Sequence, residues 1–159
     1  MLSPPCTMYS ALQELWILHR MDASSVEQRM TEANAMLDQC MACAQIQIRK
    51  GRRLAFEHPV GATSWRCESV VHVSKQPGVG TVVFDQCMLG LVSKVKRTPH
   101  RNRTRIMTNC QRILLAFQGV LCDNSHEHCV IEGSEGGEKR STHATKYPAP
   151  MAARIVSCV

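Results

Sequence analysis

The clearest pattern along the chain is a run of apolar residues at three- and four-residue steps in its first third. Ser24 and Glu27 have the spacing of a helix-capping box, and Arg49, Lys50 and Gly51 suit a helix end. Between them the apolar positions follow one face of a helix: Val26, Met30, Ala33, Leu37, Met41, Ala44 and Ile48. The sequence therefore predicts one long amphipathic helix here.

Shorter apolar runs separated by turn residues predict strands that alternate with helices. Strands are predicted at 53–57, 79–85 and 105–108, helices at about 10–19, 64–75, 113–117 and 150–158, and a polar loop at 123–145. This alternation favours an α/β fold. We expect a single domain over residues 1–159, with a small, mostly parallel sheet and flanking helices.

Composition narrows the class of protein without identifying it. Hydrophobic residues make up 44% of the chain and charged residues 20%, which is usual for a globular domain. The formal net charge of +6 favours a polyanionic partner such as DNA. The low aromatic content of 4% disfavours an RNA-binding sheet, because such surfaces stack bases on exposed rings.

The nine cysteines indicate reduced thiols rather than a disulfide framework. Their number is odd, their spacing is irregular, and no segment has the pattern of a secretory signal. No apolar run approaches the roughly 18 residues that a membrane-spanning helix needs. We therefore expect an intracellular protein, nuclear or cytoplasmic, without a membrane segment.

Two residues are candidates for a catalytic pair. Cys6 follows a proline-stiffened loop and precedes a predicted helix, where the helix dipole favours a thiolate; the alternative is an unreactive thiol in a turn. Glu57 ends a predicted strand, where α/β folds hold their ligands; the alternative is a solvated strand-end acid. Because the long helix between them would return the chain to an adjacent parallel strand, we expect the two within roughly 10 Å.

This order of elements resembles the target-base half of the DNA (cytosine-5) methyltransferase catalytic domain. The shared features are a Pro-Cys loop, a helix, a strand ending in glutamate, a second helix and an arginine-containing strand. The resemblance implies that Cys6 attacks carbon 6 of a flipped-out cytosine and that Glu57 binds the ring nitrogen and amine. Arg103 or Arg105 would correspond to the arginine pair of the family, and the resemblance implies a partial Rossmann-like fold.

The chain departs from the usual family pattern at several positions. Thr7, Tyr9 and His58-Pro59 stand where the family usually has glutamine, phenylalanine and asparagine-valine. Other segments are similar to methyltransferase-like regions of phage and retroelement-derived open reading frames, namely Phe56 to Trp65, Asp85 to Leu91, Thr108-Asn109, His126 to His128 and Tyr147-Pro148.

The resemblance does not extend to the cofactor loop of the family. Family members bind S-adenosylmethionine through a glycine-rich loop that lies well before the Pro-Cys loop, whereas two residues precede Ser3 in this sequence. The later glycines lie in a polar loop without a preceding apolar strand. The resemblance therefore implies a truncated domain that transfers no methyl group alone, unless a separate chain supplies the cofactor-binding half.

A second group of residues has the chemistry of a zinc site. Cys122, His126, His128 and Cys129 fall within eight residues, and zinc prefers four sulfur or nitrogen ligands. The first three would be ligands, with Cys87 or Cys129 as the fourth. Since this spacing matches no zinc-finger signature, the alternative is a polar loop with unliganded side chains.

A third feature is a concentration of positive charge. Six cations fall within twelve residues: Lys94, Lys96, Arg97, Arg101, Arg103 and Arg105. They would contact DNA phosphates, and if all six did so the logarithm of affinity would fall with the logarithm of salt at a slope near about −5. A solvated basic loop is the alternative.

Three functions follow from these residues. The first is a methyltransferase-like fragment that is inactive alone. The second is a small basic nucleic-acid-binding module, stabilised by zinc and without catalysis. The third is a cysteine hydrolase in which Cys6 acts with one of the seven histidines.

Overall fold

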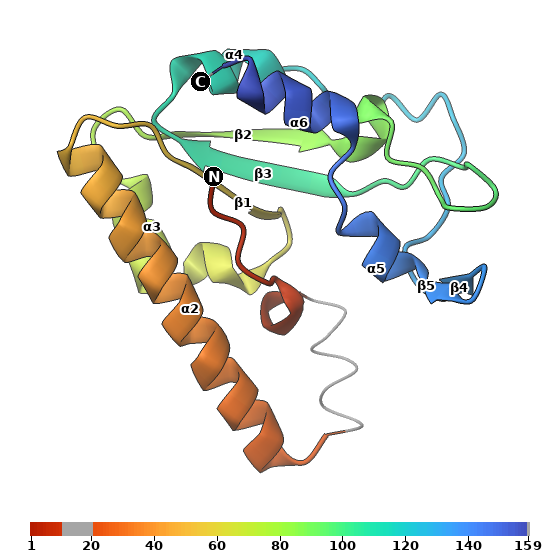
Figure 1. Cartoon of the computed structure of the whole chain (residues 1–159), viewed down its shortest axis with the longest axis horizontal. Helices are drawn as coiled ribbons and strands as arrows, with labels where there is room; N and C mark the ends of the chain where they lie inside the picture. Colours follow the sequence, from red (N-terminus) through yellow and green to blue (C-terminus); the bar gives the residue numbers. More distant parts are fainter. Residues whose placement is uncertain (11–20, 159) are drawn as a thin grey trace. The chain divides into compact units, whose positions relative to one another are not determined.

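The computed structural model describes residues 1–10 and 21–158, and these divide into two compact units (Figure 1). Unit 1 consists of Met1–Thr81 and Ile106–Cys110. Unit 2 consists of Val82–Arg105 and Gln111–Val159. The helix predicted at 10–19 lies outside the described residues, apart from its first position.

Unit 1 is built around the predicted long helix, α2 (Ala23–Arg49), which runs beside α3 (Glu68–Ser74) (Figure 1). Its buried side chains join one hydrophobic core with residues from β1 (Ala55–Pro59) and α3: Leu37, Met41, Ala44, Phe56, Val70 and Val73. The period of the apolar residues predicted this helix because only one face of it is buried.

The start of α2 differs from the prediction. Asp22 is the N-cap, and its carboxylate accepts a hydrogen bond from the Ser25 backbone N–H at 2.9 Å. Ser24 lies inside the helix and donates its hydroxyl to the same carboxylate, so the predicted Ser24–Glu27 capping box is wrong. The predicted end is confirmed, because Gly51 has φ +63°, a left-handed conformation that favours glycine after a helix.

The first residues of the chain lie against β1. Leu2 forms an isolated parallel bridge with Phe56, and the two flanking backbone hydrogen bonds join Leu2 N to Ala55 O at 2.7 Å and Glu57 N to Leu2 O at 3.0 Å. Short η1 (Thr7–Tyr9) follows. The long helix therefore does return the chain beside its starting segment in parallel orientation, at this one bridge.

The main sheet has three strands in the order β1-β3-β2, with β2 at Gly80–Asp85 and β3 at Arg103–Thr108. Leu54 N, just before β1, donates to Asn109 Oδ1, just after β3, at 2.8 Å. Gln86 N, just after β2, donates to Asn102 O, just before β3, at 3.1 Å. The central strand is therefore antiparallel to both neighbours.

The predicted mostly parallel, Rossmann-like sheet is thus wrong, although the mixture of helices and strands is confirmed. The connection from β2 to β3 contains only the 3-10 helix η3 (Gln86–Leu89). Adjacent parallel strands need a crossover connection, usually an α-helix, and no α-helix lies between β2 and β3, as expected for antiparallel neighbours. The alternation of elements in the sequence did not reveal that β3 lies between the other two strands.

Unit 2 places α4 (Gln111–Phe117) and α6 (Ala149–Val156) together on one face of its strand residues (Figure 1). The rings of Phe84 and Phe117 pack with centroids 4.4 Å apart, and Met151 of α6 is fully buried. In the predicted loop at 123–145, the structure has a hairpin of β4 (Ser134–Glu135) and β5 (Glu138–Lys139), followed by α5 (Arg140–Ala144).

None of the helices in the described ranges is both long enough and apolar enough to cross a membrane.

Candidate metal centre

Four side chains of unit 2 converge on one point. Cys87 lies in η3, directly after β2, and Cys122 lies in the loop after α4. His126 and His128 follow in the same loop. The possible ligand atoms of these four residues all lie within 4.8 Å of one another. This is the set that the sequence predicted, with Cys87 in the position that the sequence had left open between Cys87 and Cys129.

The spacing of the ligand atoms suits a tetrahedral zinc ion. Cys122 Sγ lies 3.3 Å from His128 Nε2 and 3.6 Å from His126 Nε2. Zinc bonds of about 2.3 Å to sulfur and about 2.0–2.1 Å to nitrogen place such atoms about 3.5 Å apart in a tetrahedron. The two observed separations lie on either side of this value, so the Cys122, His126 and His128 atoms are spaced as zinc ligands would be.

Without a cation, the cluster favours neutral ligands. Burial raises the pKa of Cys87 to about 11, and the neighbouring Cys122 thiol adds to this shift. Burial and the nearby His126 lower the pKa of His128. A divalent cation reverses the preference of the cysteine for its protonated form, because metals bind the thiolate and displace its proton. The His128 shift already favours the neutral imidazole that a metal needs.

Further hydrogen bonds hold Cys122 in place. Asn124 N donates to Cys122 Sγ at 3.3 Å, and Cys122 N donates to Asp85 Oδ2 at 2.9 Å. Asp85 is fully buried and also binds Arg103 through two hydrogen bonds, from Nε at 2.9 Å and Nη2 at 2.8 Å. Partners of this kind orient metal ligands and are part of most metal sites.

Sequence reasoning missed both Asp85 and Asn124. The available signal for Asp85 was an acidic residue at the end of an apolar strand, in a unit rich in arginine. Burying that carboxylate requires a charged partner, and Arg103 provides it. Asn124 has φ +63°, a conformation in which asparagine is enriched, but its contact with Cys122 depends on the fold of the loop.

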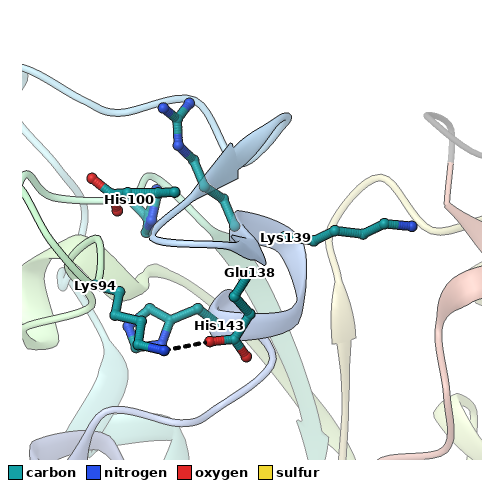
Figure 2. Close-up of a pocket in the computed structure, with 7 residues that line it drawn as sticks. Lys94, His100, Glu138, Lys139 and His143 are labelled. Carbon is teal, nitrogen blue, oxygen red and sulfur yellow. Dashed lines mark hydrogen bonds and ion pairs between the residues drawn. The ribbon is translucent and has the colours of Figure 1, made fainter.

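Two other histidines of unit 2 donate hydrogen bonds to backbone carbonyls. His100 Nδ1 donates to the carbonyl of Cys129 at 2.9 Å, and His143 Nε2 donates to Val92 O at 3.1 Å. In Figure 2, His143 lies beside the ion pair of Lys94 and Glu138, whose atoms are 2.9 Å apart, while Lys139 points away. The Lys94–Glu138 pair joins β5 to the basic segment, and neither histidine belongs to the metal cluster.

The predicted catalytic pair lies in unit 1. Glu57 is 6% exposed and accepts a hydrogen bond from Ser3 Oγ at 3.0 Å. Burial, together with the charge of Glu57, raises the pKa of the Cys6 thiol. The two residues therefore interact electrostatically, but in the direction opposite to the one expected for a nucleophile, since the thiol stays protonated. The three-residue η1 is too short to stabilise a thiolate.

His58 connects the Pro-Cys loop to β1. It is fully buried, its Nε2 lies 2.9 Å from Pro4 O, and its Nδ1 lies 2.7 Å from Ser64 Oγ. The carbonyl requires a proton on Nε2, so Nδ1 accepts the hydroxyl proton of Ser64. Because both ring nitrogens are used in this way, His58 is not placed as a base for Cys6.

The remaining predicted site residues belong to unit 2. Arg103 is paired with Asp85, and Arg105 lies two positions further along β3. Cys6 and Glu57 thus fall in one unit and the two arginines in the other. Within the basic segment, Lys94 is paired with Glu138, and Arg101 Nε lies 3.9 Å from Asp85.

Comparisons with protein-family models, with curated proteins and with solved structures find no match to this chain.

Proposed function

We propose that unit 2 is a zinc-binding module in which Cys87, Cys122, His126 and His128 hold one zinc ion. The observation that carries this proposal is the convergence of four possible ligand atoms, from two separate segments, within 4.8 Å. Two thiolates and two imidazoles are a common ligand set for structural zinc.

The ligand number supports a structural role for the ion. Four protein ligands complete a tetrahedron and leave no position for water or substrate, whereas catalytic zinc keeps one position open. The ion would link η3 to the loop after α4, a region with little regular structure of its own. Zinc binding would then contribute directly to the free energy of folding of unit 2.

The partner that we propose for this module is nucleic acid, through its phosphate backbone. Unit 2 contains eleven Lys and Arg against six Asp and Glu. Lys96 and Arg97 are exposed at a turn whose backbone is held by Glu135, which accepts hydrogen bonds from Val95 N at 3.3 Å and Lys96 N at 3.1 Å. A fixed, positively charged turn suits sequence-independent contact with phosphates.

A second candidate function is the cytosine-5 methyltransferase-like fragment. The Leu2–Phe56 bridge and the hydrogen bond from Ser3 to Glu57 favour it, because they place the segment before Cys6 beside the strand that carries Glu57. The raised pKa of Cys6 argues against a thiolate that is ready to react. We expect no methyl transfer from S-adenosylmethionine to DNA by this chain alone, and Cys6-dependent incorporation of labelled methyl would contradict that expectation.

The test of the zinc module is metal content. The full chain, purified without added metal, should contain about one zinc per chain by elemental analysis. Cys122→Ser should lose most of that zinc, whereas Cys43→Ser, which alters an exposed thiol of α2, should keep it. Less than a tenth of one equivalent in the unaltered chain, with unchanged melting in a chelator, would overturn the proposal.

A further inference from the structure

Two arginines of the basic segment are attached to the proposed metal loop. Arg101 Nη1 donates to Asn124 Oδ1 at 2.8 Å, and the backbone N–H of Asn124 donates to the sulfur of Cys122 at 3.3 Å. Asn124 therefore contacts both the sulfur of Cys122 and the guanidinium of Arg101.

Asp85 provides a second connection of the same kind. Its carboxylate accepts the backbone N–H of Cys122 at 2.9 Å and both Nε and Nη2 of Arg103. The position of Arg103 thus depends on a carboxylate that also holds the Cys122 backbone. Each arginine is thus linked to the proposed ligand Cys122 through one intervening residue.

The two guanidinium groups keep donors for an outside anion. The side chains of Arg101 and Arg103 are 38% and 42% exposed. Arg103 uses Nε and Nη2 toward Asp85, and the hydrogen bond of Arg101 to Asn124 uses Nη1. This leaves Nη1 of Arg103 and Nη2 of Arg101, and arginine N–H groups are well suited to phosphate oxygens.

We infer that zinc binding and phosphate binding are linked in unit 2, with Asn124 and Asp85 as the positioning residues. Zinc at the Cys/His cluster fixes Cys122, and Cys122 fixes Arg101 and Arg103 through these two residues. An arginine held in place before binding loses less conformational entropy when it meets a phosphodiester backbone. The zinc-loaded chain therefore binds nucleic acid more tightly than the metal-free chain. This inference rests on the proposed zinc module.

The linkage has a reciprocal consequence. If zinc raises the affinity for DNA by some factor, DNA must raise the affinity for zinc by the same factor. A simple contribution of zinc to folding would also produce linkage, so the test must separate the arginine contacts from folding.

The experiment measures binding of the full chain to a short fluorescein-labelled DNA duplex by anisotropy, with zinc and after chelation, at one fixed salt concentration. We expect the zinc form to bind at least about fivefold more tightly, the lower end of typical coupling between two sites. Zinc content and melting temperature are measured on the same samples.

Asn124→Gly separates positioning from folding. Glycine accepts the φ of +63° and retains the N–H that reaches Cys122, but it lacks the side-chain amide oxygen, Oδ1, that accepts the hydrogen bond from Arg101. We expect normal zinc content and a zinc-dependent gain in DNA affinity reduced by about half or more on a logarithmic scale. Lys146→Ala is the matched control, since it removes an exposed cation of unit 2 outside this network and should leave the gain unchanged.

Each outcome bears on a different claim. Absence of zinc binding would overturn the proposed zinc module itself. Normal zinc binding with equal DNA affinity in the two forms, or no DNA binding in either, would overturn the linkage and leave the zinc module standing. A full zinc-dependent gain in Asn124→Gly would overturn the role of Asn124.

Discussion

Units 1 and 2 are held together by different kinds of contact. Unit 1 has eight Lys and Arg against seven Asp and Glu, and its core is formed by one face of a 27-residue helix packed on β1 and α3. Unit 2 has eleven basic against six acidic residues, shorter helices, and buried polar links such as that of Asp85 with Arg103. Both units bury apolar side chains, but the ion pairs among the described residues all lie in the second unit.

This difference indicates which unit a bound metal ion would stabilise. A long amphipathic helix gains its stability by burying one face against the rest of the core. A loop such as 121–133, which has no regular element, must order its backbone with fewer apolar contacts. The binding energy of a metal held by side chains from that loop offsets the entropy lost when the loop is ordered. We therefore expect the stability of unit 2 to depend on zinc and the stability of unit 1 to be independent of it.

The largest expected effect is that of metal removal. If free zinc stands a thousandfold above its Kd, chelation or Cys122→Ser should cost unit 2 about 4 kcal/mol of stability. Hydrogen exchange read by mass spectrometry should then speed up around residues 85–87 and 120–130 and stay slow in α2. Equal loss of protection in α2 would contradict the independence of the units, and Cys43→Ser serves as the control.

A core substitution in unit 1 should destabilise that unit and leave the zinc content of the chain unchanged. Leu37 is 1% exposed on the buried face of α2, so Leu37→Ala should destabilise unit 1 by about 3 kcal/mol through lost burial and the cavity left behind. Denaturant titration and zinc content are the measurements. Met36→Ala is a matched control, because Met36 is 45% exposed on the same helix. A change of zinc content in Leu37→Ala would show that the units are coupled.

The next largest effect concerns DNA binding, whose contacts we expect to come from unit 2. Since Lys94, Arg101 and Arg103 have acidic neighbours, we expect a salt slope shallower than the about −5 of six free contacts. Lys96→Ala with Arg97→Asn should reduce the slope by up to about 1.8, since each lost contact removes about 0.9. Asparagine suits the φ of +57° at position 97.

The matched control for this titration is Lys75→Ala, which removes an exposed cation from unit 1. Equal slopes for the unaltered chain and the double variant would show that the turn does not touch DNA. A smaller slope in Lys75→Ala would show that unit 1 shares the contact.

The smallest expected effect concerns Cys6 in unit 1. Burial and the Glu57 carboxylate both raise its pKa, so the thiolate should form only at high pH. Glu57→Gln removes a negative charge that disfavours the thiolate, so the pKa of Cys6 should fall and alkylation by iodoacetamide at pH near 8 should speed up. Peptide mass spectrometry over a range of pH measures this, with exposed Cys43 as the internal reference. An unchanged pH profile would show that Glu57 does not act on Cys6.

Local patterns in the sequence determined much of the secondary structure. The apolar period predicted α2 because side chains at three- and four-residue steps share a helix face by covalent geometry. The three strands of the main sheet were placed within a few residues for the same kind of reason, whereas the β4–β5 hairpin was missed. The density of Cys and His near residue 122 indicated a metal site, because ligands that are close in sequence can meet at a small entropy cost of loop closure.

Tertiary structure decided the remaining features. Strand direction depended on β3 entering between β1 and β2, which no local pattern encodes. The fourth ligand, Cys87 rather than Cys129, is 35 residues from Cys122, and the two meet only because η3 and the loop after α4 fold together. The pairing of Arg103 with Asp85 likewise tied an arginine that was predicted to contact DNA to a buried carboxylate. Long-range pairings of this kind depend on how the elements pack, because each must repay the entropy of closing a long loop through contacts that the sequence does not place side by side.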